Sequence, residues 1–272
     1  MRRFTWTLVF GLAACGGTAV EPGPTRSSVF SVVSFEREAD GVSAGMNLDG
    51  YVSTTNDDRA CKKEDFLAPD GTEGVDNQLA TLLPLIDLVG ENAVEEILQI
   101  AVDEGRLLIV ADLAIAEDGT ATVDILRGQD VPLLGTDGRI LGGQTLGLSD
   151  EPPLGSTEGA MVDADTLETA PFNLRFPVLV FTQLYEVTFE DAVVRFELDE
   201  AGHVKSGLMA GGVPIVELID LLETAANFGQ DFADLFGDAV RESGDLARAS
   251  DGTCQNMSAS ISFEAVPTFK FR

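Results

Sequence analysis

Strict alternation of apolar and polar side chains is the strongest pattern along the chain. Met257, Ala259, Ile261 and Phe263 are separated by serines, so they share one face of an extended segment. This pattern predicts a half-buried antiparallel strand over 257–265 with its serines on the polar face. Glycine-containing turn sequences around Gly119, Gly138 and Gly202 separate other alternating runs, as in hairpins. Further strands are expected at 30–36, 107–115, 122–127, 185–189 and 194–198.

Helical spacing of apolar residues is confined to a few places. Periodicity of three and four residues predicts helices over 91–104 and within 213–247, where Pro214 stands at a helix start. A shorter helical run at 79–89 is interrupted by Pro84, which limits it to one or two turns. Residues 148–170 show neither period and are expected to form a long surface excursion. The pattern predicts an α+β fold, mainly antiparallel β sheet with a few amphipathic helices.

The first fifteen residues have the organisation of an export signal. Arg2 and Arg3 precede an apolar run that is too short to span a membrane, and small residues then lead to Cys15. Leu12-Ala13-Ala14-Cys15 resembles the lipobox of bacterial lipoproteins. The resemblance implies removal of a signal peptide, residues 1–14, and a diacylglyceryl group on the sulfur of Cys15. An ordinary signal peptide with a chance cysteine is the open alternative.

The resemblance also implies a location. Residues 15–28 are rich in Gly, Pro and Ser, which is typical of a flexible tether after the lipidated cysteine. Gly16 follows Cys15, and in such lipoproteins the lack of an aspartate there favours the outer membrane. We therefore expect an exported, lipid-anchored protein, similar in plan to uncharacterised exported lipoproteins of Gram-negative bacteria. Residues 29–272 would form a single β-rich domain.

The charge of the chain is strongly negative. Forty-six acidic residues against seventeen basic ones give a net charge of −29, and removing Arg2 and Arg3 with the signal takes it to −31. Such a chain is repelled by nucleic acid, so we expect no nucleic-acid partner. The membrane, reached through the lipid anchor, is the expected partner, together with an unidentified envelope protein or a hydrophobic ligand.

The three cysteines divide unequally. With Cys15 acylated, Cys61 and Cys254 remain, and export places them in an oxidising compartment. We predict a disulfide between them that joins the early part of the chain to its end. Two buried free thiols are the alternative.

A glycine-rich acidic segment surrounds Cys61. Clustered carboxylate and amide oxygens are the ligands that Ca²⁺ prefers, although no stretch has the spacing of an EF-hand loop. Ordinary Asx-turns, which need no metal, explain the same composition. The candidate calcium ligands are Asp49, Asp57, Asp58, Asp70, Asp76 and Asn77.

Catalytic motifs are sparse. His203 is the only histidine and is expected in an exposed turn, while neither Gly-x-Ser-x-Gly nor a phosphate-binding glycine loop occurs. Adjacent acids such as Asp199 and Glu200 could serve a glycosidase, but they are expected as solvated surface. Phenylalanines in the apolar region 171–189 are expected in the core. The more specific alternative is that they line a lipid-binding cavity inside the sheet. They are Phe172, Phe176, Phe181 and Phe189.

These observations favour a non-enzymatic binding or structural role at the cell envelope, with calcium as a candidate ligand. A carboxylate-dependent hydrolase acting on envelope or external polymers is one alternative. A hydrophobic-ligand or lipid-binding protein is the other.

Overall fold

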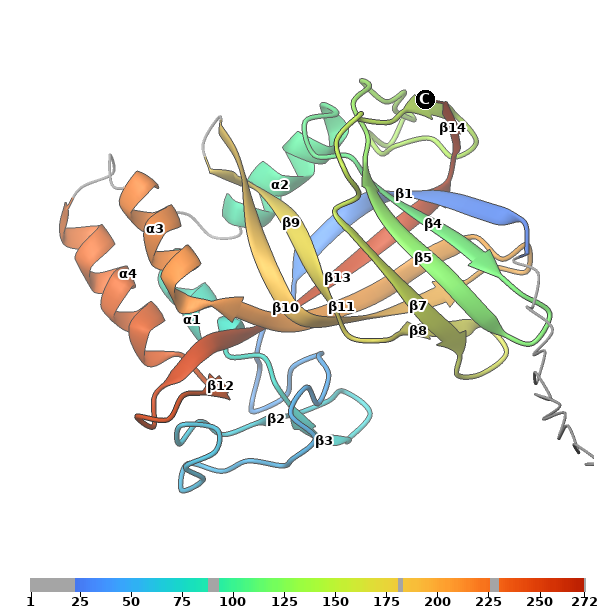
Figure 1. Cartoon of the computed structure of the whole chain (residues 1–272). Helices are drawn as coiled ribbons and strands as arrows, with labels where there is room; N and C mark the ends of the chain where they lie inside the picture. Colours follow the sequence, from blue (N-terminus) through green and yellow to red (C-terminus); the bar gives the residue numbers. More distant parts are fainter. Residues whose placement is uncertain (1–22, 88–92, 181–182, 226–229, 272) are drawn as a thin grey trace, which may run out of the picture.

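The fold is built on an antiparallel sheet that closes on itself. A computed structural model describes residues 23–87, 93–180, 183–225 and 230–271. Within these residues each strand of the cycle pairs with the next, and the last strand pairs again with the first (Figure 1). The cycle runs β1 (Thr25–Phe35), β4 (Ile109–Ile115), β5 (Thr120–Arg127), β7 (Gly155–Met161), β8 (Thr166–Thr169), β10 (Gln183–Leu198), β11 (Val204–Pro214) and β13 (Cys254–Pro267).

The remaining strands extend this closed sheet or pair outside it. β9 (Phe172–Val180) pairs with the first half of β10, and β12 (Leu246–Arg248) pairs with the start of β13. β6 (Thr145–Gly147) and β14 (Phe269–Phe271) form a short parallel pair. β2 (Phe66–Leu67) and β3 (Glu73–Val75) form a short antiparallel pair.

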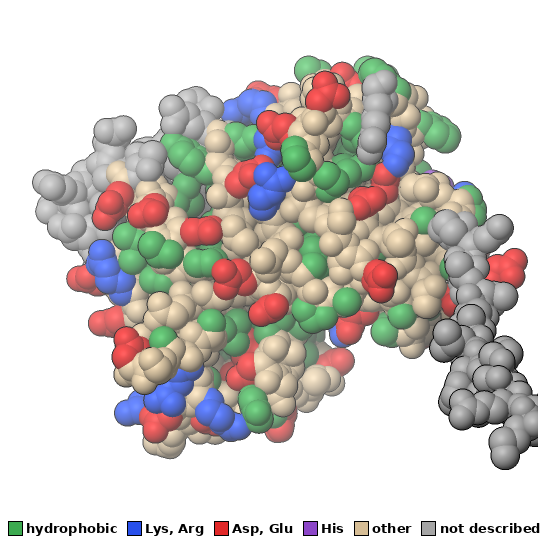
Figure 2. Space-filling view, viewed as in Figure 1, with side chains coloured by type: hydrophobic (Ala, Val, Ile, Leu, Met, Phe, Trp, Pro, Cys, Tyr) green, Lys and Arg blue, Asp and Glu red, His purple; other side chains and the backbone are tan. Residues whose placement is uncertain are grey.

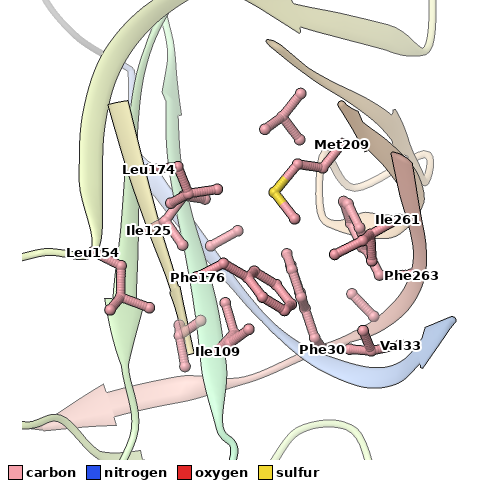
Figure 3. Close-up of a cluster of buried hydrophobic side chains, with 14 of the residues drawn as sticks. Phe30, Val33, Ile109, Ile125, Leu154, Leu174, Phe176, Met209, Ile261 and Phe263 are labelled. Atoms are coloured by element: carbon pink, nitrogen blue, oxygen red, sulfur yellow. The ribbon is translucent and has the colours of Figure 1, made fainter. Parts of the chain in front are cut away.

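The inward face of the closed sheet is filled by large apolar side chains (Figure 3). Phe30 and Phe263 stack with ring centroids 4.0 Å apart, and Phe196 meets Phe263 edge to face. Gly207 makes this packing feasible, because a Cβ there would lie 2.3 Å from the ring of Phe263. Since side chains alternate along a strand, every second residue of β13 from Met257 to Phe263 enters the apolar core. The predicted strand over 257–265 is thereby confirmed.

The phenylalanines of 171–189 also belong to the core. Phe176 and Phe189 are buried and meet edge to face with centroids 5.8 Å apart. Phe172 is partly buried and packs against the same cluster. These three positions confirm the core assignment, whereas Phe181 lies outside the described residues.

Helices within the described residues gather beside the sheet. α3 (Ile215–Ala225) and α4 (Gln230–Glu242) lie against each other at the β12 end of the molecule (Figure 1). α1 (Leu79–Ile86) has eight residues with Pro84 inside, as its sequence predicts. It shares a second apolar cluster with α4 and β13, containing Leu82, Phe236, Val240 and Met257. α2 (Ala93–Asp103) packs against β1 and β9. The predicted class, α+β with mainly antiparallel sheet, is confirmed.

Two boundaries differ from the sequence predictions. The stretch 148–170, expected as a surface excursion, contains β7 and β8. Their large apolar residues are few, Met161 in β7 and the buried Leu167 in β8, so no alternating pattern marks them. The tether predicted to end at residue 28 is also too long, because β1 begins at Thr25. Thr25 to Val29 pair with β4, and the Ser27 hydroxyl donates to Asp112, so these small polar residues serve a strand.

No helix among the described residues is long and apolar enough to cross a membrane.

Candidate functional site

The acidic segment identified in the sequence covers part of the outward face of β13. We call residues 36–78 the covering segment; it leaves the end of β1, carries β2 and β3, and leads into α1 (Figure 1). Beneath it, Ser258 and Ser260 are fully buried, although their alternation with apolar residues predicted a polar face exposed to solvent. Gly45 permits this close approach, since a Cβ there would lie 2.9 Å from the Ser260 hydroxyl. The covering segment thus converts an outward strand face into a second, polar interior.

Side chains replace a missing strand along one edge of β13. β1 pairs with β13 only as far as Ile261, and β12 pairs with it only at residues 254 and 256. Between them the Ser260 N–H donates to Asn77 Oδ1 at 3.1 Å, and the Ser258 N–H donates to Asp245 Oδ1 at 2.7 Å. Buried backbone groups require partners, so these two side chains complete the edge.

Asp245 lies at the centre of this arrangement. Its Oδ2 accepts a 2.5 Å hydrogen bond from the Ser258 hydroxyl, which itself accepts the Gln78 N–H at 2.8 Å. Burial raises the pKa of Asp245 to about 7. The hydrogen bonds from Ser258 oppose this shift, and the negative charge of Asp65 adds to it. A carboxyl with this pKa holds its proton for part of the time at neutral pH.

Asp76 and Asp65 are two neighbouring carboxyls of the covering segment. Asp76 is 2% exposed, and its Oδ2 accepts the Leu48 N–H at 2.6 Å. Burial raises the pKa of Asp76 to about 8, opposed by the Leu48 hydrogen bond and assisted by the charges of Asp245, Asp49 and Asp65. Burial likewise raises the pKa of Asp65, while hydrogen bonds from the Ser53 N–H and with the Asp76 side chain oppose the shift. Both carboxyls therefore hold their protons to higher pH than exposed aspartates do.

A disulfide fixes the covering segment to the sheet. Cys61 and Cys254 are bonded; their Cα atoms lie 6.1 Å apart, and the two residues are 193 positions apart in sequence. This confirms the predicted pair. Cys61 and Lys62 both have positive φ, 50° and 65°, so the turn that presents the sulfur is a tight left-handed one. The disulfide joins the covering segment to the first residue of β13, close to the strand positions that contact Asp245.

The six candidate calcium ligands do not converge. Asp49, Asp57 and Asp70 each accept the N–H of the residue two positions later, which is the Asx-turn chemistry weighed for this segment. Asp57 also pairs with Arg59, whose hydrogen bonds lower the pKa of Asp57 to about 2. Asp58 is exposed, Asp76 binds backbone N–H groups, and Asn77 serves β13. Among the described residues no three His, Cys, Asp or Glu side chains form a group able to hold a metal ion.

The sequence therefore located the segment, while the buried carboxyls within reach of β13 are a different set from the six candidate ligands. Asp65 lies in the acidic segment but is not among the six candidates, and Asp245 lies far outside the segment. The run of serines on β13 is the one signal that could have indicated a polar interior. It gives no indication that Asp245 is the residue that accepts the hydrogen bonds of Ser258.

The other candidate groups occupy turns. His203 follows the β10–β11 turn, where its Nδ1 lies 3.3 Å from the Ser27 carbonyl oxygen, and it is partly buried where an exposed ring was expected. Asp199 accepts the N–H groups of Ala201 and His203 in the same turn. Asp118 accepts the Thr120 N–H and hydroxyl in the β4–β5 turn. These carboxylates accept hydrogen bonds that stabilise their own turns.

Comparison with known proteins leaves the chain unassigned. No protein-family model matches it, and neither a curated protein nor a solved structure does. The chemistry of Asp65, Asp76 and Asp245, which we call the carboxyl cluster, is consequently argued from their own surroundings. Asp76 and Asp245 have pKa values near neutral pH; Asp76 accepts the Leu48 N–H within the covering segment, and Asp245 accepts the Ser258 N–H of β13.

Proposed function

We propose that this chain is an exported lipoprotein, anchored through Cys15 to the outer membrane, with a non-enzymatic binding or structural role at the cell envelope. A signal peptide of residues 1–14 directs its export, and lipid on the Cys15 sulfur retains it at the membrane. Two or three acyl chains give stable anchoring where one chain is marginal. Residues 1–22 lie outside the described residues, so this proposal begins from their sequence.

The disulfide between Cys61 and Cys254 is the observation that carries the proposal. Disulfides persist in oxidising compartments and are rare in the cytosol, so the bond supports export. It also accounts for two of the three cysteines, which leaves Cys15, the residue of the lipobox-like sequence, without a disulfide partner in its own chain. Cysteine use and the N-terminal pattern therefore agree.

The test is metabolic labelling of the full chain in a Gram-negative host with an alkyne-bearing fatty acid. Label is expected on the wild-type protein and on the Cys61→Ser/Cys254→Ser variant, which removes thiols without touching the lipobox. It is expected to be lost from Cys15→Ser. Unlabelled wild-type protein, or label that persists on Cys15→Ser, would contradict the proposal.

The carboxyl cluster favours a structural use of its acids over catalysis. Asp76 holds a proton near neutral pH, as a general acid in a hydrolase must, and this is the observation on which the alternative of a carboxylate-dependent hydrolase rests. However, Asp76 is 2% exposed and its Oδ2 is taken by the Leu48 N–H, so the group faces the protein's own backbone. Reproducible hydrolysis of an envelope polymer that is lost in Asp76→Asn but kept in Asp150→Asn would favour the enzyme.

A hydrophobic-ligand role is the remaining alternative. The inward face of the sheet is occupied by the protein's own side chains, including the stacked rings of Phe30 and Phe263. A hollow of about 440 Å³ lies on the outward face of the sheet, beside the covering segment, and polar residues such as Ser34, Ser262 and Glu264 contribute to its lining. This placement favours packing over ligand binding inside the sheet. Binding of a fluorescent fatty acid to delipidated protein tests the alternative.

A further inference from the structure

Large apolar side chains are exposed together at the end of the molecule that carries β14. They come from the loop between β5 and β6 and from β14 itself, and their exposed fractions range from 42% to 78%. Figure 2 shows hydrophobic side chains gathering there, over the end where Figure 1 places β14. An exposed apolar patch of this kind marks a surface that meets another surface. We call it the end patch: Val131, Leu133, Leu134, Leu141, Phe269 and Phe271.

Gln144 holds the two halves of the end patch together. Its side-chain amide donates to the Leu133 and Leu141 carbonyl oxygens, and its Oε1 accepts the Leu133 N–H at 2.8 Å. Its backbone carbonyl accepts the Phe269 N–H, also at 2.8 Å, which joins the loop to β14. A patch fixed in this way loses little conformational freedom on binding, which favours a built contact surface over a loose loop.

The charge of the end patch differs from that of the rest of the chain. The segments 128–148 and 266–271 hold Asp130 and Asp137 against Arg139 and Lys270, and Lys270 is paired with Asp112, so the patch carries little net charge. The net charge of −29 therefore lies elsewhere. Face-to-face pairing of two copies would bring two strongly negative bodies together, whereas a bilayer surface without net charge imposes no such repulsion. Exposed Leu and Phe side chains on a surface of low net charge, with Arg139 at its edge, suit contact with such a bilayer.

The end patch lies where the N-terminal segment enters the domain. The Thr268 N–H donates to the Ser27 carbonyl oxygen at 3.0 Å, and Phe269 is the next residue. Lys270 pairs with Asp112, which also accepts the Ser27 hydroxyl. From Cys15 to Thr25 is ten residues, which span at most about 36 Å. Lipid attached to Cys15 therefore holds this end of the domain within reach of the membrane.

We propose that the end patch docks on the bilayer surface, with Leu133 and Phe269 entering the interfacial region. The proposal rests on the proposed lipid anchor for the membrane's proximity, and it adds an orientation: the β14 end faces the membrane while α3 and α4 face away. Tethering raises the effective concentration of the bilayer near the patch, so a modest intrinsic affinity is enough.

The experiment uses single tryptophan reporters. Trp6 is the only tryptophan, so Trp6→Phe gives a silent background whether or not the signal is removed. Leu133→Trp places the reporter in the end patch, and Val216→Trp places it on α3 as a matched control of nearly equal exposure. Full-length protein is reconstituted into phosphatidylcholine vesicles with or without brominated acyl chains. A blue shift and quenching by the brominated lipid are expected at position 133 and not at position 216.

A charge variant measures the strength of the contact without the anchor. In the full chain carrying Cys15→Ser, Leu133→Glu is expected to weaken retention on phosphatidylcholine vesicles by about tenfold or more. The reason is that the variant loses the free energy gained by burying the leucine side chain. Val216→Glu is the control and leaves retention unchanged. Circular dichroism establishes that each variant folds.

The outcomes separate this proposal from the anchor. Labelled protein whose reporter at position 133 is not quenched overturns the docking proposal and leaves the anchor standing. Quenching at position 133 in unlabelled or Cys15→Ser protein supports docking although the anchor fails.

A blue shift without lipid, accompanied by a dimer in sedimentation, shows that a second copy occupies the patch and overturns membrane docking. If a monomer shows the blue shift without lipid, and removing residues 1–22 abolishes that shift, then residues 1–22 occupy the patch. This result also overturns membrane docking.

Discussion

The two faces of β13 are both buried between Met257 and Ile261, but by different means. On the inward face Ala259, Ile261 and Phe263 pack among apolar side chains of the closed sheet. On the outward face Ser258 and Ser260 are equally inaccessible, but their surroundings are the polar groups of the covering segment and Asp245. One strand therefore separates an apolar interior from a polar one.

The difference teaches which forces each interior depends on. Apolar burial is roughly proportional to area and is insensitive to direction, so the inward face tolerates any residues that fill it well. Hydrogen bonds are directional, and a buried polar group that loses its partner costs about 1–3 kcal/mol. The outward face also depends on protons held by Asp76 and Asp245 and on the disulfide. It should respond to pH and reductant, to which the inward face is indifferent.

Deleting a ring from the apolar interior should have the largest effect. Phe176→Ala is expected to lower the free energy of unfolding by about 3–5 kcal/mol, because Phe176 is 1% exposed and its removal leaves a cavity. Chemical denaturation measures this. Phe269→Ala, at an exposed position, is the matched control and should stay within about 0.5 kcal/mol of wild type. Equal losses in both variants would show that Phe176 is not part of a packed core.

Removing the disulfide should weaken the polar interior next most strongly. Cys61→Ser/Cys254→Ser releases a link between residues 193 apart, and such links are worth about 2–4 kcal/mol. Denaturation with and without reductant measures the change, since reductant should destabilise wild type and leave the double variant unaffected. A wild-type protein indifferent to reductant under denaturing conditions would contradict the structural role.

Two serines of β13 offer a matched pair. The Ser258 hydroxyl accepts the Gln78 N–H and donates to Asp245, whereas the equally buried Ser260 hydroxyl has no hydrogen-bond partner among the described residues. Ser258→Ala should cost about 1–3 kcal/mol because it leaves two buried partners unsatisfied. Ser260→Ala should be neutral or slightly stabilising. If thermal or chemical unfolding ranks them the other way, the hydrogen-bond assignment is wrong.

The pH dependence is the most gradual effect. The raised pKa values of Asp76 and Asp245, about 8 and about 7, mean that the folded protein keeps protons that the unfolded chain has released. The cluster's contribution is therefore fully present below about pH 4, and the free energy of unfolding falls as pH rises towards 8, by at most about 1.4 kcal/mol per pH unit for each group.

Asp76→Asn should flatten this slope, because an amide keeps a donor and an acceptor without titrating. Asp150→Asn, at an exposed position, is the control and should leave the slope as it is in wild type. Urea denaturation at intervals from pH 5 to 9 gives the comparison. A wild-type stability that rises through this range would contradict protonated carboxyls.

The apolar interior was largely predictable, and the polar one was not. Alternation at Ala259 and Ile261 identified β13 because the core requires apolar residues at every second position. β7 was missed because Gly159 and Ala160 provide no such contrast, although they pair regularly with β8. The disulfide followed from counting cysteines and from the expected compartment, without any geometry.

The carboxyl cluster could not be found in this way because its members are distant in sequence. Asp65, Asp76 and Asp245 look like the other acids of a very acidic chain, and only folding shows which of them are desolvated. The candidate calcium ligands lie apart in this structure for a related reason: Asp49 and Asp70 accept hydrogen bonds within their own turns. Local composition identifies a turn-rich segment but does not specify which oxygens face inward.

The central claim is that two interiors, held by different forces, meet at β13. Hydrogen exchange, corrected for the intrinsic effect of pH, tests it directly by comparing the Gln78 and Ser260 amides, which bind across the polar interior, with the Val110 and Leu126 amides of the β4–β5 ladder. Reductant and pH 8.5 together should accelerate exchange at Gln78 and Ser260 well before the ladder amides respond. If all four amides lose protection together, the molecule has one cooperative interior and the distinction is wrong.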